Sequence, residues 1–211
     1  VAHAKGDFYV LMNNDIEVLQ ENWMEQMLSN CEREEVGIVG ARLYYPDNTI
    51  QHAGLVIGIG GSLRGIGANL YQGMRRERSG YLHRAAFQMN YSAVTAALMM
   101  VKKEVYEKAG GFEEELSVAF NDVDFCLRVR NIGYLIVYDP LVEAYHYESK
   151  SRGAEDSPEK VARFQAEIEF MRNRWEDLLK KGDPNYNIHF SRVRADYSLG
   201  DPEMILRQNR K

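Results

Sequence analysis

The segment GDFYVLMNNDIEV, at residues 6–18, joins a short apolar run to a cluster of amides and carboxylates. Residues 8–12 have the length and the aromatic and β-branched content of a strand that is buried on both faces, as in a parallel sheet covered by helices. The polar cluster lies at the carboxyl end of this strand. Because ligands of open α/β sheets bind at that end, the segment predicts an α/β fold with a functional site beside residues 13–15.

Asn13, Asn14 and Asp15 have two interpretations. They can form an amide-substituted Asp-x-Asp motif, in which Asp15 binds Mg²⁺ or Mn²⁺ and leaves coordination positions open for the phosphates of a substrate. They can instead form an Asx turn, in which the Asn and Asp side chains bond their own backbone. The tripeptide alone favours the turn, because short motifs often match by chance.

Composition limits the class of protein. The 211 residues are 45% hydrophobic and 27% charged, which is typical of one globular domain, and the net charge of −5 argues against nucleic acid as a partner. Cys31 and Cys126 lie in apolar helical patterns, so we expect reduced core thiols in a cytoplasmic protein. The basic residues in 75–84 indicate a solvated surface, with contact to a diphosphate or an anionic membrane as alternatives.

Apolar periodicity predicts the other elements. Helices are expected at residues 22–31 (opened by a capping box), at 102–109, from 121 to a stop at 133, and from 158 to a stop at 182. Short strands are expected at 36–40, 93–101 and 134–138, and an extended piece at 49–59. The glycine-rich segment 58–67 predicts a flexible loop, because it lacks the lysine and hydroxyl residue that end a phosphate-binding loop.

A second acidic cluster opens the helix expected at residue 121. Asp122 and Asp124 are two positions apart, so on a helix their side chains diverge by more than a right angle and cannot both point into one cleft. We expect one of them to face a site and the other to cap the helix or pair with Arg128. A carboxylate that faces a site can serve as the general base for a hydroxyl group.

The third cluster is AYHYESKSRG, at residues 144–153. A lone histidine beside aromatic residues is more often a packing residue than a ligand. Here His146 precedes Ser149, Ser151 and Arg152, whose donor groups suit phosphate oxygens. These neighbours favour a functional site.

Taken in their order, the clusters resemble the family 2 inverting glycosyltransferases of the GT-A fold, particularly bacterial members that build rhamnose-containing or other surface polysaccharides. The matching pieces are residues 11–18, 40–44 with 51–54, 93–97 with 110–112, 121–128, 145–153 and 182–186. The resemblance implies a mixed α/β sheet flanked by helices, without the family's N-terminal nucleotide-binding strands. Residues 1–211 would form one domain, with the metal and acceptor side of the site in 1–153 and a C-terminal helix and tail in 154–211.

The resemblance also implies residue roles. Asp122 matches the family's catalytic base, Asp15 matches the last acid of its Asp-x-Asp motif, and His146 matches a histidine that helps to hold the metal or the diphosphate in some relatives. Asn121 stands where the family usually has Glu, which leaves that carboxylate without a counterpart. The residues expected to bind substrate or diphosphate are Asn13, Asn14, Thr95, Asp124, Ser149, Ser151 and Arg152.

The implied enzyme is a nucleotide-sugar-dependent hexosyltransferase that uses Mg²⁺ or Mn²⁺, a UDP- or dTDP-sugar donor and a saccharide or lipid-linked saccharide acceptor. Because the family's nucleoside pocket precedes the Asp-x-Asp motif, we expect these 211 residues to be part of a longer protein, to bind sugar nucleotides weakly and to be inactive alone. The parent would be cytoplasmic or peripheral at the inner face of the membrane. An open sheet edge would favour a homodimer.

Two other classes stay open. The chain can be a non-catalytic binding or structural fragment, whose acids only cap helices and turns. It can also be a sugar-phosphate nucleotidyltransferase, which shares an α/β sheet with metal-binding acids but ordinarily has a glycine-rich, lysine-bearing loop near its start. Replacing Asp122 by Asn separates the first class from a transferase, because only catalysis needs a general base.

Overall fold

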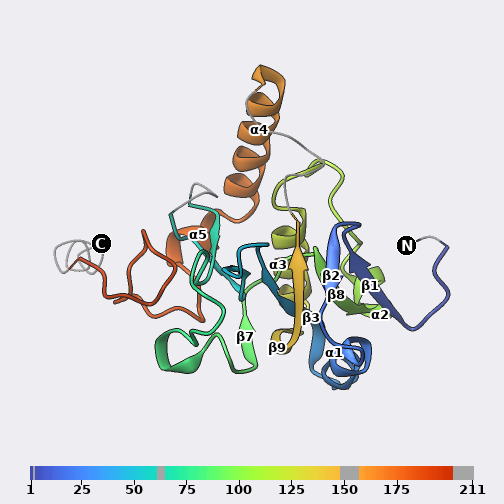
Figure 1. Ribbon diagram of the computed structural model, residues 1–211. Helices are drawn as coiled ribbons and strands as arrows, with labels where there is room; N and C mark the ends of the chain where they lie inside the picture. The colour runs from blue at the N-terminus through green and yellow to red at the C-terminus, as the bar shows by residue number, and fades with distance from the viewer. Residues whose placement is uncertain (2, 61–64, 148–156, 202–211) are drawn as a thin grey trace.

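The computed structural model describes residues 1, 3–60, 65–147 and 157–201, which form a mixed α/β structure (Figure 1). The main sheet has seven strands, of which five lie side by side in the order β1, β8, β3, β9 and β2. The strands are β1 (Phe8–Met12), β2 (Ile16–Val18), β3 (Val36–Tyr44), β4 (Ile50–His52), β7 (Met89–Tyr91), β8 (Leu98–Lys102) and β9 (Leu135–His146). β3 and β9 are parallel, whereas the β1–β8, β3–β8, β2–β9, β3–β4 and β7–β9 pairs are antiparallel. The expected mixed sheet with flanking helices is confirmed.

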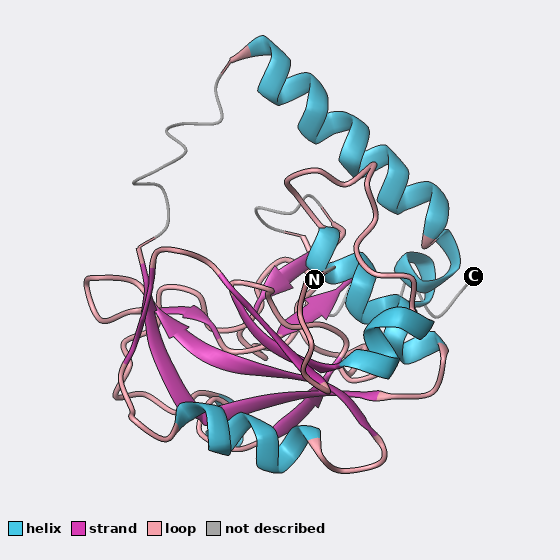
Figure 2. Cartoon of the chain, turned by 90° about the vertical axis from the view of Figure 1, so that its right-hand side faces the viewer, coloured by secondary structure: helices cyan, strands magenta, loops and turns pink. Residues whose placement is uncertain are grey.

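Helices cover both faces of the sheet (Figure 2). α1 (Trp23–Cys31) packs on one face, and α2 (Lys103–Lys108) and α3 (Asn121–Asn131) lie on the other. α4 (Pro158–Arg174) and α5 (Glu176–Lys181) follow, and a small second sheet pairs β5 (Leu55–Ile57) with β6 (Gly67–Asn69). Neighbouring residues of β3 divide between two cores, since Val39 packs with Met27 of α1 and Ile38 packs with Val129 of α3.

The central strand of the sheet is β3 and not β1. All nine residues of β3 are buried, whereas β1 lies at the edge, pairs with β8 alone among the described strands, and exposes Val10 and Met12. The expectation that residues 8–12 form a strand buried on both faces of a parallel sheet is therefore wrong. The segment has strand-like residues because one of its faces packs on the core through Tyr9, which is 6% exposed.

β9 is longer than the pattern at 134–138 predicts, because Asp139 and Pro140 do not end it. The register with β3 shifts at this point, since Ala41 pairs with Asp139 but the next residue, Arg42, pairs with Glu143. Pro140, which has no N–H group, therefore lies in a bulge where no ladder hydrogen bond is required of it. After the bulge β9 continues to His146 and carries that residue to the same end of the sheet as Asp15.

The predicted helices form, but several predicted ends and caps differ from the structure. The four expected helices form, but the capping box at Asn22 does not, because its side chain makes no cap hydrogen bond. Of the strand expected at 93–101, β8 forms only from Leu98 onward, because Ala93 makes an isolated bridge with Leu55 and residues 96–97 form a turn. The long C-terminal helix is divided at Trp175 into α4 and α5. Cys31 and Cys126 are buried free thiols, as expected. No described helix is both long and apolar enough to span a membrane.

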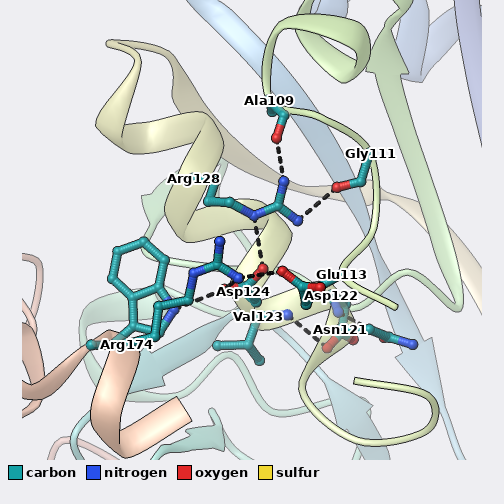
Figure 3. A network of polar contacts seen from close by, with 10 residues as sticks. Ala109, Gly111, Glu113, Asn121, Asp122, Val123, Asp124, Arg128 and Arg174 are labelled. Atoms are coloured by element: carbon teal, nitrogen blue, oxygen red, sulfur yellow. Dashed lines mark hydrogen bonds and ion pairs between the residues drawn. The ribbon is translucent and has the colours of Figure 1, made fainter. Parts of the chain in front are cut away.

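A buried carboxylate joins the C-terminal helices to α3 (Figure 3). Asp124 is fully buried and accepts hydrogen bonds from Trp175 Nε1 at 2.9 Å and from Arg128 Nε at 2.8 Å. Arg174 at the end of α4 lies 3.5 Å from the same carboxylate and 2.6 Å from Glu113. Such a carboxylate is stable only when its oxygens are satisfied, so the indole N–H holds α4 and α5 against α3.

Replacing Trp175 by Phe should lower the free energy of unfolding by about 1.5–3 kcal/mol, because a hydrogen bond to a buried charged group is lost. Urea denaturation followed by far-UV circular dichroism measures this change. The matched control is Trp23→Phe in α1, which removes the chain's other indole. An equal loss of stability in both variants would show that the bond to Asp124 is not the reason.

Candidate functional site

A cleft of about 590 Å³ opens where β1, the 95–97 turn and the start of α3 meet. Its lining combines polar residues with apolar and aromatic ones. The lining residues are Val10, Leu11, Met12, Asn13, Leu55, Asn69, Thr95, Ala96, Ala97, Phe112, Val118, Ala119, Phe120, Asn121, Asp122, Val123 and His146. The predicted clusters at 13–15, 121–124 and 144–147 therefore meet at one end of the sheet.

Asp15 and His146 are brought together by the pairing of β2 with β9, in which Ile16 lies opposite His146. The Asp15 Oδ1 atom is 3.2 Å from His146 Nε2, and the Asn13 side-chain nitrogen is 3.1 Å from the same Nε2. His146 is 8% exposed and the Asp15 side chain is 22% exposed. The three side chains form a compact polar group at the rim of the cleft.

This group fits a divalent cation. Asp15 Oδ1 is buried without a hydrogen-bond donor, so a buried acceptor there lacks a partner. Two ligands of one octahedral ion lie about 3.0 Å apart, which is close to the observed separation of Asp15 Oδ1 and His146 Nε2. The described residues contain no group of three or more His, Cys, Asp or Glu side chains that could hold a metal ion. The pair can therefore supply two ligands, which suits Mg²⁺ or Mn²⁺ because these ions take their remaining ligands from water and phosphate.

Asp122 lies at the first turn of α3 and lines the cleft. Its Oδ2 atom accepts a hydrogen bond from the Ala96 N–H at 3.3 Å, and its Oδ1 atom accepts one from the Val123 N–H at 2.8 Å. Burial raises the pKa of Asp122, and hydrogen bonds from the Thr95 hydroxyl and the Ala96 N–H oppose this shift. A partly desolvated carboxylate held by two backbone donors is suited to accept a proton.

The raised pKa makes stability depend on pH in a definite direction. Folded Asp122 keeps its proton above 3.8, the ordinary value of such a group, so the folded state binds more protons than the unfolded state in this range. The contribution of Asp122 to the free energy of unfolding therefore falls as pH rises through its folded pKa. Asp122→Asn should remove this fall, because the amide does not titrate. Thermal melts of both proteins between pH 3 and pH 8 measure the difference, and parallel curves would contradict the shift.

Two residues that were not selected from the sequence, His52 and Gln51, support polar residues of the cleft without lining it themselves. His52 is 1% exposed, its Nδ1 atom is 2.6 Å from Asn69 Oδ1, and its Nε2 atom accepts the Thr95 N–H at 3.3 Å. Burial lowers the pKa of His52 to about 4, so the ring is neutral and holds the turn that carries Thr95. The side-chain oxygen of Gln51 lies 2.7 Å from Nδ1 of the His146 ring. The signal for both was their place in the matching segment 51–54.

Only some of the predicted site residues line the cleft. Asn13, Thr95, Asp122 and His146 line the cleft, and Asp15 contacts His146 at its rim, whereas Asn14 is exposed outside the lining. Asp124 does not line the cleft and is 0% exposed. Its predicted role in substrate binding is therefore corrected, and the alternative prediction, a pair with Arg128, is confirmed at 2.8 Å. The other three predicted residues, Ser149, Ser151 and Arg152, lie outside the described residues.

No family model matches the chain. It is 47% identical over 207 residues to the uncharacterized protein y4gI of Sinorhizobium fredii, covering 98% of this chain and 22% of that protein. It is 34% identical over 196 residues to the O-antigen biosynthesis protein RfbC of Myxococcus xanthus, covering 93% of this chain and 15% of that protein. An N-acetylglucosaminyl-diphospho-decaprenol L-rhamnosyltransferase of Mycobacterium tuberculosis is 26% identical over 81 residues, covering 38% of this chain and 26% of that protein. The chain thus spans about a quarter or less of the length of these relatives.

Solved structures show the same fold at low sequence identity. The mannosyltransferase PcManGT of Pyrobaculum calidifontis, in complex with GDP-Man and Mn²⁺, superposes with a TM-score of 0.50 and 14% identity, over 84% of this chain and 44% of that one. GalNAc-T7 with UDP, GalNAc and Mn²⁺ superposes with a TM-score of 0.55 and 11% identity, over 83% of this chain and 33% of that one. Both are GT-A structures.

Proposed function

We propose that the chain belongs to a glycosyltransferase-like family with the GT-A fold and that it carries the cation ligands and the general base of a nucleotide-sugar-dependent glycosyltransferase. The observation that carries the proposal is the cleft itself. It holds His146, which contacts Asp15, and also holds Asp122, a carboxylate whose pKa is raised by burial. The names of two relatives support a role in surface polysaccharide synthesis.

In the proposed reaction Asp122 accepts the proton of a saccharide hydroxyl as that oxygen attacks the anomeric carbon of the donor. The attack comes from the face opposite the leaving nucleoside diphosphate, so the configuration at the anomeric carbon is inverted. The Ala96 and Val123 N–H groups hold the Asp122 carboxylate in place while it acts. Asp122 ends the step protonated, and its raised pKa makes that form easier to reach.

Asp15 and His146 would hold Mg²⁺ or Mn²⁺, which when bound neutralises the charge that develops on the departing diphosphate. The Asn13 side-chain nitrogen lies 3.1 Å from His146 Nε2, and once a cation takes that nitrogen's lone pair the amide would be able to donate to a phosphate oxygen. The two carboxylates thus have different tasks: Asp15 serves the leaving group and Asp122 serves the nucleophile.

The donor is proposed to be a nucleoside-diphosphate sugar, and the acceptor a saccharide or a lipid-linked saccharide. GDP-Man and UDP are present in the similar structures, so the UDP- or dTDP-sugar expected from the sequence is one choice among several. Phe112 and Phe120, which line the cleft, offer aromatic surface to the apolar face of a sugar. Peripheral membrane association and dimerisation at the β1 edge stay predictions.

The proposal is tested on the protein as its gene encodes it, with a panel of UDP-, dTDP- and GDP-sugars and Mn²⁺. Release of the nucleoside diphosphate in the presence of a saccharide acceptor is the measurement. Asp122→Asn should lower the rate by about 10²–10⁴-fold, because the general base is lost while the shape of the side chain is kept. The matched control, Asp177→Asn on the exposed face of α5, should leave the rate unchanged.

Two results would contradict this function. A rate retained in Asp122→Asn would remove Asp122 as the base and favour a binding or structural role. Transfer of a nucleotidyl group from a nucleoside triphosphate to a sugar phosphate, with no transfer from any nucleotide sugar, would show a nucleotidyltransferase instead.

A further inference from the structure

We propose that Gln51 is a positioning residue that fixes the ring of His146 with its proton on Nδ1, so that the lone pair of Nε2 and the carboxylate of Asp15 face a divalent cation together. The inference rests on the proposed function for the identity of the cation. The position of the His146 ring proton is a property of the metal-free protein.

Gln51 makes two hydrogen-bond contacts with His146. Gln51 Oε1 lies 2.7 Å from His146 Nδ1, and Gln51 Nε2 lies 3.5 Å from the backbone oxygen of His146. The second contact requires a donor toward the carbonyl oxygen, which sets the amide so that its own oxygen points at the ring. Gln51 is 5% exposed, so water competes little for these contacts.

The contacts of Gln51 locate the imidazole proton. A carbonyl oxygen only accepts hydrogen bonds, so Nδ1 of His146 must donate to Gln51. A neutral imidazole has one ring proton, and Nε2 is then an acceptor. The surroundings of Nε2 agree, because the nitrogen of the Asn13 amide, a donor, lies 3.1 Å away and occupies the lone pair that a bound cation would take over.

The second neighbour of Nε2 is the Asp15 carboxylate, and it explains why the proton position matters for a cation. Asp15 Oδ1 lies 3.2 Å from Nε2 and is buried without a hydrogen-bond donor. Two acceptors that face each other at this distance repel unless positive charge lies between them. With the ring proton held by Gln51 on the far nitrogen, a metal ion can supply that charge without first displacing a proton from Nε2.

The backbone explains how Gln51 reaches this position. β4 pairs with β3 through Leu43 opposite His52 and Tyr44 opposite Ile50, so the register shifts and Gln51 has no opposite residue in β3. Such a bulge turns side chains away from the regular alternation of a strand. As a result the neighbours Gln51 and His52 both serve the cleft, through His146 and through Thr95 respectively.

The test uses protein labelled with ¹⁵N-histidine, in which the signals of the five histidines of these 211 residues are assigned by substitution. Long-range ¹H–¹⁵N correlation spectra, recorded at neutral pH without metal, should show His146 protonated on Nδ1 and unprotonated on Nε2. Gln51→Leu should lose this preference and should weaken Mn²⁺ binding, measured by electron paramagnetic resonance, by about 10–100-fold. Gln51→Glu keeps an acceptor for Nδ1 and should restore both properties.

The control is Gln26→Leu, which removes an amide that donates to Asp139 at 3.0 Å and should alter neither readout. A His146 ring with a proton on Nε2, or with both nitrogens protonated in an ion pair with Asp15, would overturn the proposal whatever the enzyme does. Equal Mn²⁺ affinity in the wild type and in a folded Gln51→Leu protein would also overturn it. A third result is possible, in which His146 is protonated on Nδ1 but the protein binds no Mn²⁺. This result would support the role of Gln51 and would overturn only the proposed metal centre.

Discussion

The pairing of β9 with β3 on one side and with β2 on the other is the constraint on which the site depends. Parallel pairing with the buried strand β3 fixes the course of β9 through the core, and the bulge after Asp139 lets the strand continue past Pro140. Antiparallel pairing with β2 then sets Ile16 opposite His146. Asp15 and His146 are 131 positions apart in the chain, and these two ladders bring them into contact.

The polar residues of the cleft are held by neutral residues rather than by charged ones. Gln51 contacts the ring of His146, while the buried, neutral His52 accepts the N–H of Thr95, whose hydroxyl contacts Asp122. Two adjacent residues of β4 thus support His146, a proposed cation ligand, and the turn beside Asp122, the proposed base. Neutral supports carry no charge of their own, so they orient the site without competing for a cation or a proton.

The sequence predicted the parts of the site that are local and failed where distant pairing decides. Helix α3 and the divergence of Asp122 from Asp124 follow from helical spacing, which is a property of a few residues. The position of β1 at the edge could not be read from its composition, because one buried face is enough to select strand-forming residues. The role of Gln51 depends on a bulge and on a partner 95 positions away, and no periodicity in the sequence carries that information.

Asp15 and His146 are proposed to form a cation site beside a separate base, Asp122. Anomalous diffraction from crystals soaked in Mn²⁺ tests it most directly. The account predicts a manganese peak within about 2–2.5 Å of both Asp15 Oδ1 and His146 Nε2, with no peak in contact with Asp122. A peak that bridges Asp122, or manganese found only at surface carboxylates away from the cleft, would contradict it.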